Sequence, residues 1–175
     1  FLREGAAISD FMRPDRVVIG VESEAAERRL RDLYRPLNLI ETPIVVTGLE
    51  SAELIKYASN AFLATKISFI NEIANLCDLV SADIDGVSQG MGLDHRIGSA
   101  FLGAGIGFGG SCFPKDVEAL ELLARDNGHK FELLRSVVSV NDRQRRSVLT
   151  RLRQLIPDLS GASVAVLGLS FKPET

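Results

Sequence analysis

The residues best suited to chemistry lie in one stretch, GAGIGFGGSCFPKD, which covers residues 103–116. Five glycines precede Cys112 there, and because glycine has no Cβ, a ligand can approach the backbone closely. Pro114 is typical of a helix start, and Asp116 suits the positive end of the helix dipole. A cysteine just before a helix start, with Lys115 nearby, favours the thiolate, which is the nucleophilic form. We therefore predict a reactive cysteine here rather than a buried structural one.

The same stretch contains a formal match to the dinucleotide fingerprint G-x-G-x-x-G, at residues 105–110. A true fingerprint follows a strand and has an acidic residue about 20 positions further on. Residues 98–103 are not strand-like, and a helical pattern follows residue 114. We therefore do not interpret these glycines as a dinucleotide-binding loop.

Lys56 and Asn60 form a second candidate pair, because residues four apart lie on one face of a helix. The ordinary interpretation is that both side chains are solvated, as most Lys and Asn side chains are. We expect neither to belong to the apolar face of this helix. Spacing alone does not distinguish a solvated pair from a catalytic pair.

The sequence resembles the UDP-glucose 6-dehydrogenase and GDP-mannose dehydrogenase family. The motif GFGGSCFPKD at residues 107–116 is similar to the active-site cysteine motif of that family. Three further segments carry the resemblance: FLREGAAISDF at the start, KYASNAFLATKISFINEIA from residue 56, and GLSFKPET at the end. Members of the family use NAD to oxidise the alcohol of a sugar nucleotide to a carboxylate. Within the family, GFGGSCFPKD together with Arg96-Ile-Gly favours UDP-glucose as the substrate.

The resemblance implies roles for individual residues. Cys112 would bind the substrate covalently as a thiohemiacetal and then as a thioester. The other catalytic residues would be Lys56, Asn60, Asp116 and Glu4. Cofactor contacts would come from Glu4, Cys112 and Lys115. The expected substrate-binding residues are Phe1, Leu2, Lys56, Asn60, Arg96, Phe101, Gly105, Phe108, Gly109, Phe171 and Lys172. Gly103 stands where many members have a substrate-binding lysine, and no metal is implied.

The apolar pattern predicts two long helices, over residues 50–80 and 130–156, and shorter ones over 24–35 and 114–126. The first long helix would begin with a capping box at residues 47–50, and its buried stripe would include positions 54, 55, 58, 62, 63, 67, 70, 73, 74 and 77. Asp83 would cap a short helix that ends near Gly90 or Gly92. Strands are expected at residues 17–21 and 44–46, as a parallel βαβ unit, and at residues 164–169.

We therefore expect a mainly α chain, α/β overall, whose central helical domain is flanked by partial Rossmann-like pieces. The resemblance implies three domains: residues 1–47 as the end of an NAD-binding domain, 48–157 as the central dimerisation domain, and 158–175 as the start of a UDP-sugar domain. The first residue is Phe rather than Met, which we interpret as an internal fragment of a longer protein. The length of the first long helix and the match at Arg96 indicate a homodimer.

Composition excludes several classes of function. The 175 residues carry a net charge of −3, so the overall charge favours neither nucleic acid nor an anionic membrane as a partner. No apolar run is long enough to span a membrane, and the first residues do not resemble a signal peptide. Two cysteines do not form a disulfide framework, which indicates a reducing cytoplasm.

Three alternatives stay open at this point. The substrate could be GDP-mannose or a UDP-N-acetylhexosamine. The chain could be a dimerisation module that catalyses nothing on its own. Finally, a thiol-based acyltransferase would also use a reactive cysteine, but its full sequence would lack a dinucleotide fingerprint.

Overall fold

The computed structural model describes residues 2–3, 5–40 and 42–168, without the side chains of residues 38–40. Four residues that the family resemblance assigns to the site lie outside the described residues: Phe1, Glu4, Phe171 and Lys172. The described residues divide into two compact units. We name them the N-terminal unit, which runs up to Ala58 and also includes residues 167–168, and the central unit, Ser59–Val166.

The N-terminal unit contains a small parallel sheet. Its elements are α1 (Ala7–Met12), β1 (Val17–Gly20), α2 (Glu24–Tyr34), the 3-10 helix η1 (Arg35–Ile40) and β2 (Ile44–Thr47). Strands β1 and β2 pair in parallel, with Val17 opposite Ile44 and Gly20 opposite Thr47. Ser23 caps α2, because its hydroxyl accepts a hydrogen bond from the Ala26 N–H at 3.2 Å. The predicted βαβ unit is therefore confirmed.

Helix α3 (Leu49–Val80) is a single helix of 32 residues that begins in the N-terminal unit and continues into the central unit. The expected capping box does not form, because the N-cap position falls on Gly48, which has no side chain to cap the helix. Thr47 is the last residue of β2, and the carbonyl of Gly48 accepts the hydrogen bond from the Ala52 N–H. Gly48 thus takes the N-cap position, because Thr47 is already paired in the sheet.

The buried face of α3 differs from the predicted apolar stripe. Leu54 and Phe62 are exposed, the latter by 64%. The buried positions instead carry mostly small or polar side chains: Asn60, Ala61, Ala64, Ser68, Ile70, Asn71 and Cys77. Small residues let a neighbouring backbone approach closely, and the Ser68 hydroxyl donates to the carbonyl of Val137 at 3.1 Å.

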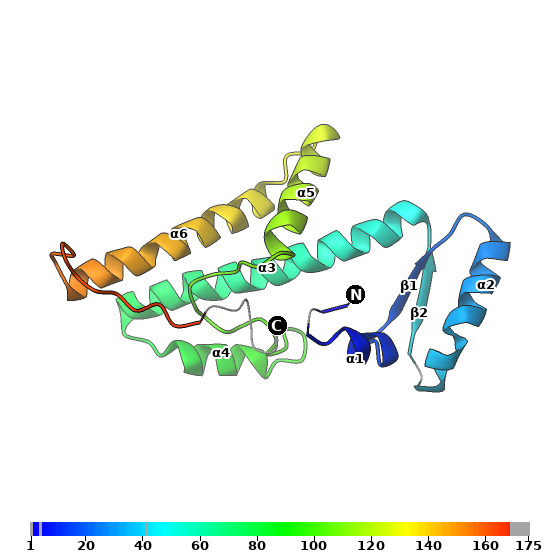
Figure 1. The fold of residues 1–175 in the computed structure, drawn as a ribbon, viewed down its shortest axis with the longest axis horizontal. Coiled ribbons are helices and arrows are strands. Elements are labelled where there is room, and N and C mark those ends of the chain that lie inside the picture. Colours follow the sequence, from blue (N-terminus) through cyan, green and yellow to red (C-terminus); the bar gives the residue numbers. More distant parts are fainter. Residues whose placement is uncertain (1, 4, 41, 169–175) are drawn as a thin grey trace. The chain divides into compact units, whose positions relative to one another are not determined.

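The central unit also contains α4 (Ile84–Gly92), α5 (Phe113–Asp126) and α6 (Glu132–Leu155). Asp83 caps α4 as predicted, accepting from the N–H groups of Asp85 and Gly86. Helix α6 runs along α3 in the same direction (Figure 1), because residue numbers rise together in the pairs that join them. These pairs are Ser68 with Val137, Asn75 with Gln144, and Asp78 with Arg151.

The strand expected at residues 164–169 is wrong for its described part. Residues 162–168 have no regular secondary structure, and Val166 is 81% exposed. An apolar run forms a buried strand only where other strands satisfy its N–H and C=O groups. None of the described residues pairs with this segment, so the predicted Rossmann-like piece after Pro157 is not formed among them.

We expect Gly20→Ala to destabilise the protein by about 1–3 kcal/mol, since an added methyl must displace its surroundings. A Cβ at Gly20 would lie 2.8 Å from the Cβ of Ala52 and 3.2 Å from the Leu49 Cα, at the start of α3. Gly90→Ala is the control, because nothing lies within 4 Å of its added Cβ. The control should be neutral or stabilising by about 0.5–1 kcal/mol. Urea unfolding measures both, and equal effects would contradict the tight β1–α3 contact.

Candidate functional site

Cys112 lies at the junction between the glycine loop and α5, where it occupies the N-cap position. Its side chain is exposed, and the Ser111 hydroxyl lies 3.6 Å from Sγ. Phe113 is the first residue of α5 and Pro114 the second, so the helix begins one residue earlier than predicted. The thiol is therefore accessible and lies at the positive end of a helix of 14 residues.

Behind the cysteine, a buried polar pair joins α3 to α5. The Asn60 side chain donates from Nδ2 to Oδ2 of Asp116 at 2.6 Å. Asn60 is only 9% exposed, so the expectation that it lies outside the buried face of α3 is wrong. Lys115 Nζ lies 3.8 Å from the other oxygen of Asp116, and its own side chain is mostly exposed. The buried amide therefore orients this carboxylate, and the exposed ammonium lies near it.

The glycine loop is held by side-chain amides from two helices. Oδ1 of Asn71, on α3, accepts from the Gly105 N–H at 2.8 Å. Nε2 of Gln144, on α6, donates to the Gly105 carbonyl at 2.8 Å. Both polar groups of this one peptide residue are thus satisfied by side chains. Nδ2 of Asn71 is buried and has no hydrogen-bond partner within the described part of the chain.

A second set of hydrogen bonds, between Asn141 and Phe108, holds the loop; we name it the clamp. Asn141, on α6, accepts from the Phe108 N–H at 2.7 Å and donates to the Phe108 carbonyl at 3.0 Å. Gly107 has a φ of +103°, and a Cβ there would collide with Oδ1 of Asn141. Only glycine fits at this position, both for its backbone conformation and for the space beside the clamp.

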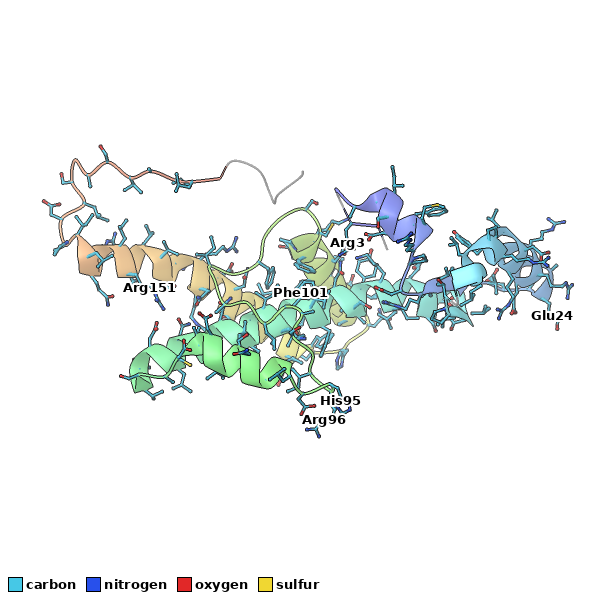
Figure 2. The ribbon with its side chains drawn as sticks, turned by 90° about the horizontal axis from the view of Figure 1, so that it is seen from below. Arg3, Glu24, His95, Arg96, Phe101 and Arg151 are labelled. Atoms are coloured by element: carbon cyan, nitrogen blue, oxygen red, sulfur yellow. The ribbon has the colours of Figure 1, made fainter. Side chains whose placement is uncertain are left out.

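Three phenylalanines connect the loop to the start of α5. The ring of Phe113 lies edge-on to Phe101 and to Phe108, with centroid distances of 6.1 and 6.0 Å. Phe108 is buried, whereas Phe101 is exposed by 41% and has a φ of +65° (Figure 2). Such a φ is rare for a bulky side chain and marks local strain. The strained Phe101 thus presents an aromatic ring to solvent in the same cluster that contacts the residue after Cys112.

Arg96 lies in the turn that follows α4, where Figure 2 shows it directed outward beside His95. Its guanidinium donates to both oxygens of Asp94, at 3.0 and 2.6 Å. These hydrogen bonds lower the pKa of Asp94 below its ordinary value. Lys66 fastens the turn to α3, because its Nζ donates to the carbonyls of Ile97 and Gly98 at 3.0 and 3.2 Å.

The structure brings together only part of the predicted site. Asn60, Cys112, Lys115 and Asp116 meet around the start of α5, and the loop supplies Gly105, Phe108 and the exposed Gly109. Leu2 and Lys56 belong to the N-terminal unit, where Leu2 is exposed and Lys56 is half-buried on α3.

The sequence analysis missed the residues that hold the loop: Asn71, Asn141, Gln144 and Lys66. The available signal was a polar amide inside an apolar helical pattern, as at Asn71 between Ile70 and Ile73. Because such a buried amide needs a partner, it indicates a polar backbone nearby.

The described residues contain neither a metal-binding cluster nor a membrane-spanning helix. No cluster of three or more His, Cys, Asp or Glu residues in that part of the chain could hold a metal ion. None of its helices is long and apolar enough to span a membrane.

Two domains of one protein family match this chain. The central domain of the UDP-glucose/GDP-mannose dehydrogenase family matches residues 50–143, and the NAD binding domain of the same family matches residues 1–38. The chain belongs to this family. Cys112, Asn60 and Asp116 all lie within the part that matches the central domain.

Individual relatives agree with this assignment. The chain is 54% identical to UDP-glucose 6-dehydrogenase YwqF of Bacillus subtilis, with all of this chain and 39% of that enzyme covered. The UDP-glucose dehydrogenase structure from Pyrobaculum islandicum has a TM-score of 0.85 at 43% identity, covering 90% of this chain and 36% of that one. A GDP-mannose dehydrogenase from Pseudomonas aeruginosa has a TM-score of 0.51 at 34% identity, covering 90% and 35%. The chain thus spans about two fifths of the length of its curated relatives.

We expect Asn60→Ala to destabilise the protein by about 1–3 kcal/mol, because it removes a buried donor from the Asp116 carboxylate. Lys115→Ala removes the exposed cation near the same carboxylate and should change the stability by less than about 0.5 kcal/mol. Thermal and urea unfolding of both variants make the comparison. If the Asn60 variant were as stable as the Lys115 variant, the buried pair would not stabilise the start of α5.

Proposed function

We propose that this chain is part of a UDP-glucose 6-dehydrogenase, an enzyme that oxidises the sugar C6 alcohol to a carboxylate in two NAD-dependent steps. The observation that supports this most strongly is the exposed Cys112 at the N-cap of α5, set between an amide-held glycine loop and the buried Asn60–Asp116 pair. A four-electron oxidation passes through an aldehyde, and an exposed thiolate at this place could retain it.

The residues present fit a family member that uses NAD. The N-terminal unit has two parallel strands joined by α2, which is the arrangement of a dinucleotide-binding domain. In this chain, the residues that would hold NAD are Lys115 and Cys112, both exposed, together with Glu4. NAD, when bound, accepts one hydride in each of the two oxidations.

Cys112 forms and breaks the covalent bonds in this proposal. Its thiolate adds to the C6 carbonyl of the aldehyde: the C–S bond forms as the C=O π bond breaks, and the oxygen takes up a proton to give the thiohemiacetal hydroxyl. Loss of hydride and of the hydroxyl proton converts the thiohemiacetal to a thioester. Water then attacks the thioester carbonyl, the C–S bond breaks, and the carboxylate leaves while the thiolate is restored. Serine could not replace the cysteine, because its hydroxyl is not ionised near neutral pH.

Lys56 would stabilise the developing oxyanion, and the Asn60–Asp116 pair would assist proton transfer. Lys56 lies one helical turn before Asn60 on α3 and is the proposed donor to the developing alkoxide or oxyanion. The Asp116 carboxylate, fixed by Asn60, would orient the water that takes part in proton transfer. Glu4 would assist the hydrolysis of the thioester.

Two features favour a nucleotide sugar as the substrate. The guanidinium of Arg96, which is paired with Asp94, and the ring of Phe101 both lie at the surface of the central unit. Arginine suits a diphosphate, and an aromatic face suits a base. UDP-glucose is favoured over GDP-mannose because the UDP-glucose dehydrogenases are the more similar relatives in both sequence and structure.

Cys112→Ser in the full-length protein should abolish the overall oxidation of UDP-glucose, with a loss of turnover of about 10³-fold or more. The assay is NADH formation with UDP-glucose, GDP-mannose and UDP-N-acetylmannosamine as substrates. Cys77→Ser is the matched control, because Cys77 is buried on α3 and has no proposed role in the chemistry. Near-normal turnover of the Cys112 variant would contradict the covalent mechanism, and preference for GDP-mannose would reassign the substrate.

We also infer a homodimer through α3. Phe62, Phe69 and Leu76 are spaced by seven residues and are 64%, 48% and 52% exposed, so they form one apolar stripe opposite the buried face. A second copy of the same chain is the proposed partner, because a self-complementary surface produces the commonest type of homo-oligomer.

Phe69→Glu in the full-length protein should convert the dimer to a monomer at micromolar concentration, because it places a charge in the middle of the apolar stripe. Leu133→Glu, at an exposed apolar position on α6, is the control and should leave the dimer intact. Sedimentation velocity distinguishes the two species. A monomeric wild-type protein, or a dimeric Phe69 variant, would refute this interface.

A further inference from the structure

We propose that Asn141 is a positioning residue for the cysteine loop, an inference that rests on the proposed function of Cys112. Asn141 lies on α6 and does not reach the thiol itself. Its side chain makes two hydrogen bonds with one loop residue, Phe108, accepting from the N–H at 2.7 Å and donating to the C=O at 3.0 Å. It therefore fixes the orientation of both peptide groups around Phe108, four residues before Cys112.

The position of Phe108, which the clamp holds, affects the position of Cys112. Phe108 is buried, and its ring lies 6.0 Å from that of Phe113, the residue that directly follows Cys112. The chain between Phe108 and Cys112 contains Gly109 and Gly110, and Gly110 has a φ of +79°. Such glycines give the segment conformational freedom, so its position depends on contacts at its ends.

The clamp belongs to a larger network on α6. One turn after Asn141, Gln144 donates to the Gly105 carbonyl at 2.8 Å and accepts from Asn75 of α3 at 2.9 Å. Asn141 and Gln144 are both buried, with 4% and 8% exposure. Two consecutive turns of α6 thus hold the two ends of the segment 105–108.

The surroundings of Asn141 show that its geometry is strongly constrained. Gly107 has no room for a Cβ beside Oδ1 of Asn141, and its φ of +103° excludes other residues. The amide orientation is also fixed, because reversing O and N would place a donor against the Phe108 N–H and an acceptor against its carbonyl. Leucine, although similar in volume, would leave both Phe108 groups without this partner.

The test compares Asn141→Ala with Ser68→Ala in the full-length protein. Ser68 is a matched control: it is 3% exposed, and its hydroxyl donates to the Val137 carbonyl between α3 and α6 without contacting the loop. Asn141→Ala should accelerate hydrogen exchange of the Phe108 amide by about tenfold or more and lower kcat by on the order of 10- to 100-fold. Ser68→Ala should lower the melting temperature by a similar amount while kcat stays within about twofold, as expected for a purely structural residue.

An unchanged rate of hydrogen exchange at the Phe108 amide in the Asn141→Ala variant would contradict the proposed clamp. Faster exchange with normal kcat, or an equal loss of kcat in the Ser68 variant, would overturn the positioning role. If Asn141→Ala does not fold, Asn141→Ser decides, because the shorter hydroxyl keeps a polar side chain but cannot bond both the N–H and the C=O of Phe108. It should give the same pattern, and normal exchange and kcat in it would overturn the proposal. A wild-type protein that forms no NADH with any sugar nucleotide would refute the proposed function instead, and hydrogen exchange would still decide the clamp.

Discussion

The site depends on how an irregular glycine loop, exposed along most of its length but buried at Phe108, satisfies its backbone polar groups. A glycine-rich segment with positive φ angles cannot form helix or sheet hydrogen bonds, yet unpaired buried N–H and C=O groups are costly. Here the side chains of Asn71, Asn141 and Gln144 supply the missing partners at Gly105 and Phe108. The long helices are therefore more than a scaffold, because their buried amides fix the conformation of the loop that ends at Cys112.

The same constraint explains the composition of the helices. The inner face of α3 carries Ala61, Ala64 and Ser68, which allow α6 to approach closely enough for its amides to reach the loop. The large apolar side chains that do not fit this face lie on the opposite one, where they form the exposed stripe of α3. One helix thus has a small, polar face toward the loop and a large, apolar face that is exposed.

Local signals made part of this structure predictable. The Pro after Cys112 and the acidic first turn located the start of α5 to within one residue, and the uninterrupted pattern after Thr47 gave the extent of α3. Long-range partners were not predictable in the same way. The burial of Asn60 depends on Asp116, which is 56 positions away. Residues 164–168 form no strand because none of the described residues pairs with them. An apolar pattern indicates which face of a helix is hydrophobic, but it does not indicate which element packs against that face.

The central claim is that Cys112 carries the substrate covalently. Its most direct test is acid quenching of the full-length Glu4→Gln variant, in which thioester hydrolysis should be slow, during oxidation of UDP-glucose. Mass spectrometry of the peptide that contains Cys112 should then show the added mass of a UDP-glucuronyl group, and hydroxylamine should remove it. An unmodified Cys112 peptide at every quench time, while NADH continues to form, would contradict the account.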